Sequence, residues 1–347
     1  MSLKYRIRRI GFSVWYYFKG TRRYKKLRLD LPKLTSEEKK QFKETWPGVT
    51  ILPLDYIYAR IYKKIQGFSP YYLAPSWFYE LRKFINPKKQ LYALENKALC
   101  DVYFPEISFP EPYVRRLNGL FYDKDMNYIT REEAERILRE KKEFIIKPSL
   151  GTLQGQGVAK VNCEKDNVSE AINKAGKDFI AQEVLRQAPE IERLNPSSLN
   201  CFRVTTLYMN GKFDYSTMLK VGKKGAFRDN WNCAYLMGVD KNGVLCEFAY
   251  DYDLNPITQS DNGMVFKGMA MPCFQEIIQH CEQMHKKYFA NCGVIGWDVT
   301  LDSDYKVRVV ETNLFNPGTN MEQYASGDFF RPFRDDMLQY KDRALKK

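Results

Sequence analysis

The sequence predicts an α+β fold in which a mainly helical N-terminal region precedes a part rich in strands. Three observations support this prediction. Residues 45–110 are rich in aromatic side chains and broken by prolines, with helical stretches such as 77–85 between them. Residues 131–184 read as helix, strand, glycine-rich loop, strand, helix and strand, and residues 200–250 as four strands with short turns. The 347 residues, 44% of them hydrophobic, suffice for two or three packed units.

The first element of the strand-rich part is a charged helix expected at residues 131–141. Thr130 followed by Glu133 forms a capping box, in which each side chain accepts a hydrogen bond from the backbone N–H of the other residue. The next elements expected are a strand at 143–147, a strand at 158–161, a helix at 168–175 and a strand at 179–184.

The following part predicts an antiparallel sheet. Asn210–Gly211 and Asn242–Gly243 are typical two-residue hairpin turns, which join neighbouring antiparallel strands. The strands are expected at 200–209, 213–221, 234–239, 244–250, 293–301 and 306–311, and a long amphipathic helix at 271–289.

The charge of the chain is concentrated at its N-terminal end. The net charge is +13, but residues 1–50 hold 14 Lys or Arg against 4 Asp or Glu, so the other 297 residues are close to neutral. Residues 4–28 combine this charge with apolar residues at helical spacing. This pattern is typical of a helix on an anionic membrane surface, and equally of a basic helix packed on the protein's own body. A nucleic-acid-binding function is disfavoured, because such proteins spread their cations over a folded face.

Cysteine usage and hydropathy favour a cytoplasmic protein, with a peripheral position at the inner membrane face left open. The eight cysteines show no C-x-x-C pair and are expected to be reduced and mostly buried. The longest uncharged stretch near the start, residues 10–18, is too short to span a bilayer, so no transmembrane helix is predicted. It also lacks the small-residue cleavage site of a signal peptide.

A glycine-rich loop follows the strand at 143–147. Gly151, Gly155 and Gly157 would let backbone amides approach phosphate oxygens closely. The loop matches neither a P-loop nor a dinucleotide fingerprint, and a mobile hairpin turn is the alternative interpretation.

The last two predicted strands carry a candidate metal site. Glu311 and Asn313 are two residues apart on one strand and share a face, and Asp298 can join them from the neighbouring strand. Two carboxylates and an amide oxygen suit Mg²⁺. The alternative is an acid at a strand edge and a surface turn, but inward carboxylates in apolar strands would be costly without a cation.

Arg203 and Lys220 lie in strands with apolar neighbours, where an inward cation needs an anionic partner such as phosphate. The alternative is that each points outward or pairs with a nearby acid.

These elements, in this order, resemble the ATP-grasp superfamily, and more closely its sugar-transfer-associated branch. The resemblance covers about residues 90–330, and several motifs in order are more specific than any one alone. It implies two α+β lobes that grip a nucleotide, preceded by the mainly helical region. The motifs that carry it are Ile146-Lys147-Pro148, the loop 149–158, Gln182-Glu183-Val184, and the runs 194–206, 229–230, 295–299 and 309–313.

The resemblance implies that ATP and Mg²⁺ are bound. Lys97 and Lys147 would serve the nucleotide, and the loop with Gly151, Gly155 and Gly157 would fold over the triphosphate. The hinge residues expected to bind adenine are Gln182, Glu183 and Val184, and Glu190 is the candidate acid for the ribose.

The same resemblance implies a transfer site. Asn200 and Arg203 would lie beside the transferred phosphate, with Lys220 as a further cation. The implied magnesium ligands are Asp298, Glu311 and Asn313.

The implied activity is that of a carboxylate ligase acting through an acylphosphate, a reaction for which the protein supplies positioning and charge. The family points to polysaccharide or capsule biosynthesis, with an amino acid or similar group joined to a sugar acid or a lipid-linked sugar. Two alternatives stay open: an ATP-dependent kinase of a sugar hydroxyl, and a non-catalytic nucleotide-binding protein.

The expected organisation has five parts. They are a basic N-terminal segment at 1–44, a preliminary domain at 45–115, a small lobe at 116–186, a large lobe at 187–335 and a basic tail at 336–347.

Overall fold

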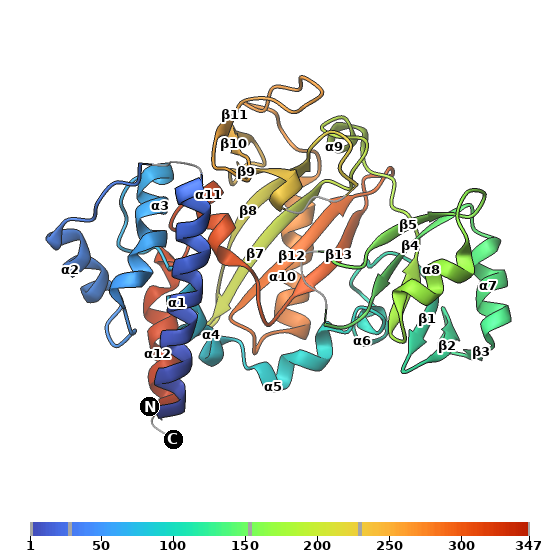
Figure 1. Ribbon diagram of the computed structural model, residues 1–347, viewed down its shortest axis with the longest axis horizontal. Helices are drawn as coiled ribbons and strands as arrows, with labels where there is room; N and C mark the ends of the chain where they lie inside the picture. Colours follow the sequence, from blue (N-terminus) through green and yellow to red (C-terminus); the bar gives the residue numbers. More distant parts are fainter. Residues whose placement is uncertain (1–2, 27–29, 152–154, 228–230, 346–347) are drawn as a thin grey trace.

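The computed structural model describes residues 3–26, 30–151, 155–227 and 231–345. Figure 1 shows three parts side by side: a helical region, a central sheet and a smaller sheet. The α+β fold with a helical N-terminal region is therefore confirmed.

The helical region is built from both ends of the chain. Trp46 and Trp77 lie in the same buried core as Phe330 and Met337. The segments expected as a basic N-terminal segment, a preliminary domain and a basic tail thus form one packed unit, because their apolar faces cover one another. Its elements are α1 Leu3–Lys26, α2 Ser36–Thr45, η1 Pro53–Asp55, α3 Tyr56–Gln66, α4 Pro75–Ile85, α11 Thr319–Ser326, η4 Arg331–Phe333 and α12 Arg334–Leu345.

The basic helix α1 packs one face on the body and leaves another face in water. It contacts α3 and α4, and the Phe12 ring stacks on the Tyr79 ring at 3.9 Å between centroids. Ile7 and Phe18, on that other face, are exposed. Packing on the protein's own body therefore does not cover Ile7 and Phe18.

The small lobe is a six-stranded sheet in the order β3-β2-β1-β6-β4-β5, with α7 and α8 packed on it. It begins at Pro112 rather than at residue 116, because β1 pairs with both β2 and β6. The capping box of Thr130 and Glu133 is confirmed. The elements are β1 Pro112–Leu117, β2 Leu120–Asp123, β3 Tyr128–Ile129, α7 Arg131–Arg139, β4 Glu143–Pro148, β5 Ala159–Asn162, α8 Val168–Ala175 and β6 Phe179–Gln182.

The large lobe is a seven-stranded antiparallel sheet in the order β11-β10-β9-β8-β7-β12-β13. One face buries Phe202, Trp297 and Val299 in a core shared with α10. The opposite face is turned toward the small lobe and the helical region (Figure 1). The elements are α9 Pro189–Glu192, β7 Cys201–Met209, β8 Lys212–Gly222, η3 Trp231–Cys233, β9 Ala234–Val239, β10 Leu245–Tyr250, β11 Pro256–Ile257, α10 Phe274–Tyr288, β12 Val294–Leu301 and β13 Val307–Asn313.

Short connecting elements run from the helical region to the small lobe. They are α5 Lys88–Leu91, η2 Tyr92–Glu95 and α6 Cys100–Tyr103. The backbone N–H of Lys97 donates to the carbonyl of Ser149, so this connection meets the start of the glycine-rich loop. All eight cysteines are free thiols. Within the described ranges, every helix is too short or too polar to cross a membrane.

Candidate active site

A cleft of about 710 Å³ lies where the two sheets and the helical region meet. The small lobe supplies residues of β4 and β6, and the large lobe supplies residues of β7, β8, β12 and β13. The structure brings most of the residues singled out in the sequence to this cleft. Those that line it are Lys97, Lys147, Gly155, Gln182, Glu183, Val184, Arg203, Lys220, Asp298, Glu311 and Asn313.

The strand register explains why the large-lobe residues share one face. Arg203 on β7 is directly opposite Asp298 on β12, and Asp298 is opposite Glu311 on β13. Residues directly opposite each other in antiparallel strands project to the same side of the sheet. Lys220 on β8 is opposite Cys201, which is two residues from Arg203 and so shares its face. The sheet thus presents cations and acids in one row.

Asp298 is the centre of this row. Its carboxylate accepts two hydrogen bonds of 3.0 Å from Arg203, and Lys220 Nζ lies 3.0 Å from Asp298 Oδ1. Burial alone would raise the pKa of Asp298, but the charges of Arg203 and Lys220 outweigh burial and hold this pKa well below its usual range. Asp298 is therefore held in its anionic form and offsets one of the two positive charges of Arg203 and Lys220.

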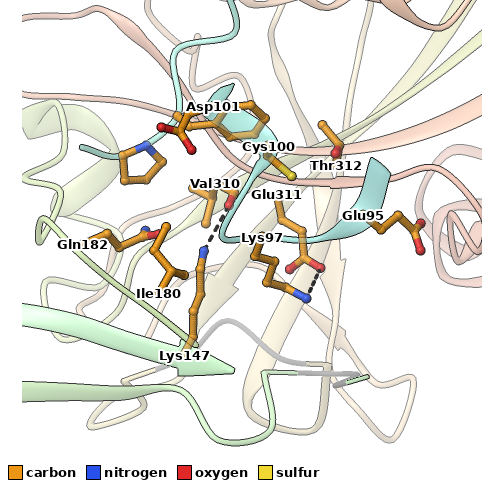
Figure 2. A pocket seen from close by; sticks show the side chains of 12 residues that line it. Glu95, Lys97, Cys100, Asp101, Lys147, Ile180, Gln182, Val310, Glu311 and Thr312 are labelled. Atoms are coloured by element: carbon orange, nitrogen blue, oxygen red, sulfur yellow. Dashed lines mark hydrogen bonds and ion pairs between the residues drawn. The ribbon is translucent and has the colours of Figure 1, made fainter. Parts of the chain in front are cut away.

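A second group of charges lies at the small-lobe side of the cleft (Figure 2). Lys97 Nζ is 3.4 Å from Glu311 Oε1, and Lys147 Nζ lies 3.5 Å from the carbonyl oxygen of Val310. Burial lowers the pKa of Lys147, and the neighbouring charge of Lys97 lowers it further, whereas Glu311 raises it. Two lysines beside one carboxylate form a site that attracts further negative charge.

The candidate metal ligands are compatible with Mg²⁺. Asp298, Glu311 and Asn313 offer carboxylate and amide oxygens, the ligand class of this ion. The described residues contain no group of three or more His, Cys, Asp or Glu side chains arranged for a metal, so this candidate depends on two carboxylates and one amide. Both carboxylate oxygens of Asp298 already contact the cationic groups of Arg203 and Lys220. Mg²⁺ therefore fits best together with a bound anion that pairs with Arg203 and Lys220 in place of Asp298.

The glycine-rich loop and the hinge close the small-lobe side. Gly155 lines the cleft. Gly157 has a φ of +75°, and a Cβ there would lie 2.7 Å from Cγ of Pro148, so this turn requires glycine. Residues 152–154 of the loop, and residues 229–230 of another motif, lie outside the described residues. The Glu183 carboxylate pairs with Arg308 of the large lobe, which links the hinge to β13.

Four of the expected site residues do not line the cleft: Gly151, Gly157, Glu190 and Asn200. The Asn200 side chain is fully buried and donates to the carbonyls of Ile191 and Asn195. It holds the turn before β7 and does not face the cleft. Glu190 accepts hydrogen bonds from the Tyr305 hydroxyl.

Sequence reasoning missed several residues that line the cleft. Glu192, two positions after Glu190 and at the end of α9, lines it. Trp15, Tyr16 and Tyr58 of the helical region also line it. No motif marked these aromatic residues, because only the packing of α1 and α3 brings them to the cleft.

Two sheets face each other across the cleft. One side holds a glycine-rich loop, and the other holds a row of cations and acids. This arrangement is that of an ATP-grasp fold. Residues 166–334 match the family model for sugar-transfer associated ATP-grasp proteins. This part of the chain, which holds most of the large lobe with Arg203, Lys220 and Asp298, is similar to that family. The resemblance stated from the motifs is confirmed.

The solved structures that match part of this chain include an ATP-grasp ligase. D-Alanine-D-alanine ligase from Helicobacter pylori has 13% sequence identity and a TM-score of 0.41, over 71% of this chain and 58% of that one. The ATP-grasp ligase PsnB, solved with a minimal precursor, Mg and ADP, has 14% identity and a TM-score of 0.41, over 75% and 62%. Carboxyaminoimidazole ribonucleotide synthase from Aspergillus clavatus, solved with ATP, has 14% identity and a TM-score of 0.40, over 65% and 46%.

The chain thus spans less than two thirds of the length of these enzymes. No match was found among curated proteins.

Proposed function

We propose that this protein is an ATP- and Mg²⁺-dependent carboxylate ligase that acts through an acylphosphate. The observation that carries the proposal is the convergence of four cationic side chains on one cleft. Lys97 and Lys147 approach from one side, and Arg203 and Lys220 from the other. Such an arrangement is suited to a triphosphate, whose transfer requires positioning and charge stabilisation rather than a side-chain nucleophile.

In the proposed reaction, a substrate carboxylate oxygen attacks the γ-phosphorus of ATP, and the bond to the β-phosphate oxygen breaks to release ADP. An amine or hydroxyl of the acceptor then attacks the acyl carbon, and inorganic phosphate leaves. The acceptor proton passes to the departing phosphate or to solvent. In this proposal Arg203 and Lys220, which line the cleft, would hold the phosphoryl oxygens, and Lys147 and Lys97 would hold the rest of the triphosphate.

Asp298, Glu311 and Asn313 are the residues that would hold Mg²⁺. The ion would neutralise charge on the phosphate oxygens. The role of Asp298 on its own is to keep Arg203 and Lys220 in place before the nucleotide binds, because it pairs with both.

For the substrate, the match to sugar-transfer associated proteins supports a sugar acid or sugar intermediate, joined to an amino acid or similar group during polysaccharide or capsule assembly. Aromatic side chains such as Trp15 and Tyr58 line the end of the cleft that the helical region supplies. An apolar, aromatic surface of this kind can stack against a sugar ring.

The first test measures the thermal unfolding midpoint with Mg²⁺ alone, ATP alone, and both. A ligand at 100 times its dissociation constant stabilises the folded state by about 2.7 kcal/mol. We expect a rise with ATP and Mg²⁺ together and none with Mg²⁺ alone, because both oxygens of Asp298 are occupied by cations until phosphate arrives.

The matched variants are Glu311→Gln, which removes a candidate ligand, and Glu164→Gln, an exposed glutamate of the small lobe. The first should lose the magnesium-dependent part of the rise, and the second should keep it. The nucleotide site is disproved if wild type shows no rise at saturating nucleotide.

Product analysis then distinguishes the alternatives. Free phosphate together with a new amide or ester supports the ligase. A phosphorylated acceptor would instead indicate a sugar kinase, and nucleotide binding without turnover of any carboxylate would indicate a binding protein.

A further inference from the structure

The rotation of α1 about its own axis is fixed by one buried arginine. Arg9 is 2% exposed, and its guanidinium lies 2.9 Å from Asp55 Oδ2 and 3.3 Å from Glu80 Oε2. It also donates to Ser13 on the next turn of the same helix. A buried cation held by two carboxylates allows little rotation, because any turn would leave charges unpaired in the interior.

With Arg9 and Ser13 facing the interior, this orientation of α1 leaves other side chains exposed to solvent. Ile7, Ile10 and Phe18 are 61%, 51% and 65% exposed. With 100° between successive residues, these three span about 80° of the helix circumference, on a face centred about 120° away from that of Arg9 and Ser13. Burial of an apolar side chain is favourable, so three large ones exposed on one face favour binding of a partner there.

The charge on α1 indicates the kind of partner. Apart from the buried Arg9, residues 3–26 contain eight Lys or Arg and no Asp or Glu. A second copy of the same helix would face like charges in a symmetric contact. A nucleic acid would satisfy the charges but not the aliphatic side chains. An anionic bilayer satisfies both, because its headgroups attract cations and its acyl boundary accepts apolar side chains.

The outward face and the cleft meet at one residue. Trp15 is 52% exposed and also lines the cleft, beside Tyr16 of the same helix. The ring of Tyr16 in turn lies 5.7 Å from that of Tyr58, another lining residue. A surface that covers the apolar face of α1 would therefore lie at the helical-region end of the cleft.

We infer that α1 docks through Ile7, Ile10 and Phe18 on an anionic lipid bilayer, and that the cleft opens beside this surface at Trp15. Taken with the proposed function, on which this step depends, the acceptor is an amphiphile whose polar head enters the cleft while its apolar part stays in the membrane. The helix lies in the plane of the interface and does not cross the bilayer.

The test is co-sedimentation of the full chain with phosphatidylcholine vesicles that contain or lack phosphatidylglycerol, at low and high salt. The variant is Ile7→Ser/Ile10→Ser/Phe18→Ser, which leaves the cleft untouched. The matched control is Leu120→Ser/Tyr128→Ser, since these side chains are 51% and 65% exposed on the distant small lobe. We expect wild type and control to bind anionic vesicles and to be released by salt, and the triple variant to bind about tenfold or more weakly.

Two results would overturn the inference. One is equal binding of wild type and triple variant to anionic vesicles. The other is a wild-type dimer in solution that the triple variant abolishes, with no vesicle binding, which would mean that a second copy covers the face. The nucleotide-dependent rise in unfolding midpoint should be unchanged in the triple variant. Vesicle binding without that rise in wild type would disprove the ligase and leave the docking intact.

Discussion

Glu322 on α11 lies close to the row of charges. Its ionisation should make the stability of the folded protein depend on pH. It is 1% exposed, and it accepts a hydrogen bond from the Thr205 hydroxyl on β7. Burial raises its pKa to about 8, although the Thr205 hydrogen bond and the charge of Arg203 lower it. The folded protein therefore holds a proton on Glu322 at neutral pH.

When folding raises the pKa of an acid, the direction in which stability changes with pH follows from it. Between the ordinary glutamate pKa and about 8, the folded state keeps a proton that the unfolded state has released, so stability falls as pH rises through this window. We expect Glu322→Gln to remove this contribution and to be the more stable protein at alkaline pH. Urea unfolding from pH about 5 to about 9 measures both slopes.

The control for this comparison is Glu164→Gln, an exposed residue whose replacement should leave the wild-type slope unchanged. Parallel pH curves for wild type and Glu322→Gln would show that the carboxyl is ionised in the folded protein.

For single residues, the sequence predicts well which side chains share a face of the sheet. It predicts less well which role each side chain has. An acid inside apolar strand β12 requires a positive partner; the sequence favours a metal ion there, and the structure shows Arg203 and Lys220 beside Asp298. Sequence alone does not distinguish a metal ion from an arginine, because both satisfy the same carboxylate. Motif order predicts Asn200 beside the phosphate, yet its side chain donates hydrogen bonds to the carbonyls of Ile191 and Asn195. Sequence spacing does not reveal such local hydrogen bonds.

At the scale of elements, two glycines allow the contribution of local backbone conformation to stability to be measured. Gly211 follows Asn210 in the turn between β7 and β8. The backbone φ is +79° at Gly211 and +52° at Asn210. A Cβ at Gly211 would meet no atom within 4 Å, so only backbone strain opposes a side chain there. Gly11 in α1 is also free of neighbours but lies in an ordinary helix.

We expect the same substitution to act in opposite directions at the two glycines. Gly211→Ala should destabilise the protein by about 1 kcal/mol because of the left-handed backbone, and Gly11→Ala should stabilise it by about 1 kcal/mol through helix propensity. Chemical denaturation of the two single variants measures both. A loss of stability at both positions would mean that α1 needs its glycine for packing.

The same local rules explain which elements the sequence could predict. The hairpin at Asn210–Gly211 and the capping box at Thr130 depend only on neighbouring residues, and both were found. Strand ends shifted by one or two residues, because pairing with another strand decides where a strand stops. The start of the small lobe differs more, at Pro112 instead of the expected residue 116, since β1 pairs with the distant β6.

At the scale of the whole molecule, the helical region is not a separable unit. Its core includes Met209 at the end of β7 and Val294 at the start of β12. The Asn86 side chain donates to the Val294 carbonyl at 2.6 Å and accepts from the Val294 N–H at 3.1 Å. Sequence boundaries at residues 44 and 335 could not anticipate this, because contacts between distant segments leave no local pattern. The small lobe, in contrast, has a core of its own.

Removal of residues 1–90 should therefore unfold the large lobe rather than release a smaller ATP-grasp core. The deletion removes partners of Met209, Val294 and Phe330, and it leaves the end of β7 and the start of β12 uncovered. We expect the fragment 91–347 to lose the near-ultraviolet circular dichroism of the buried Trp297 and to unfold without a cooperative transition. A fragment that unfolds cooperatively and still binds ATP would show that the helical region is an added module. Its close packing would then serve the position of α1 beside the cleft rather than the stability of the sheet.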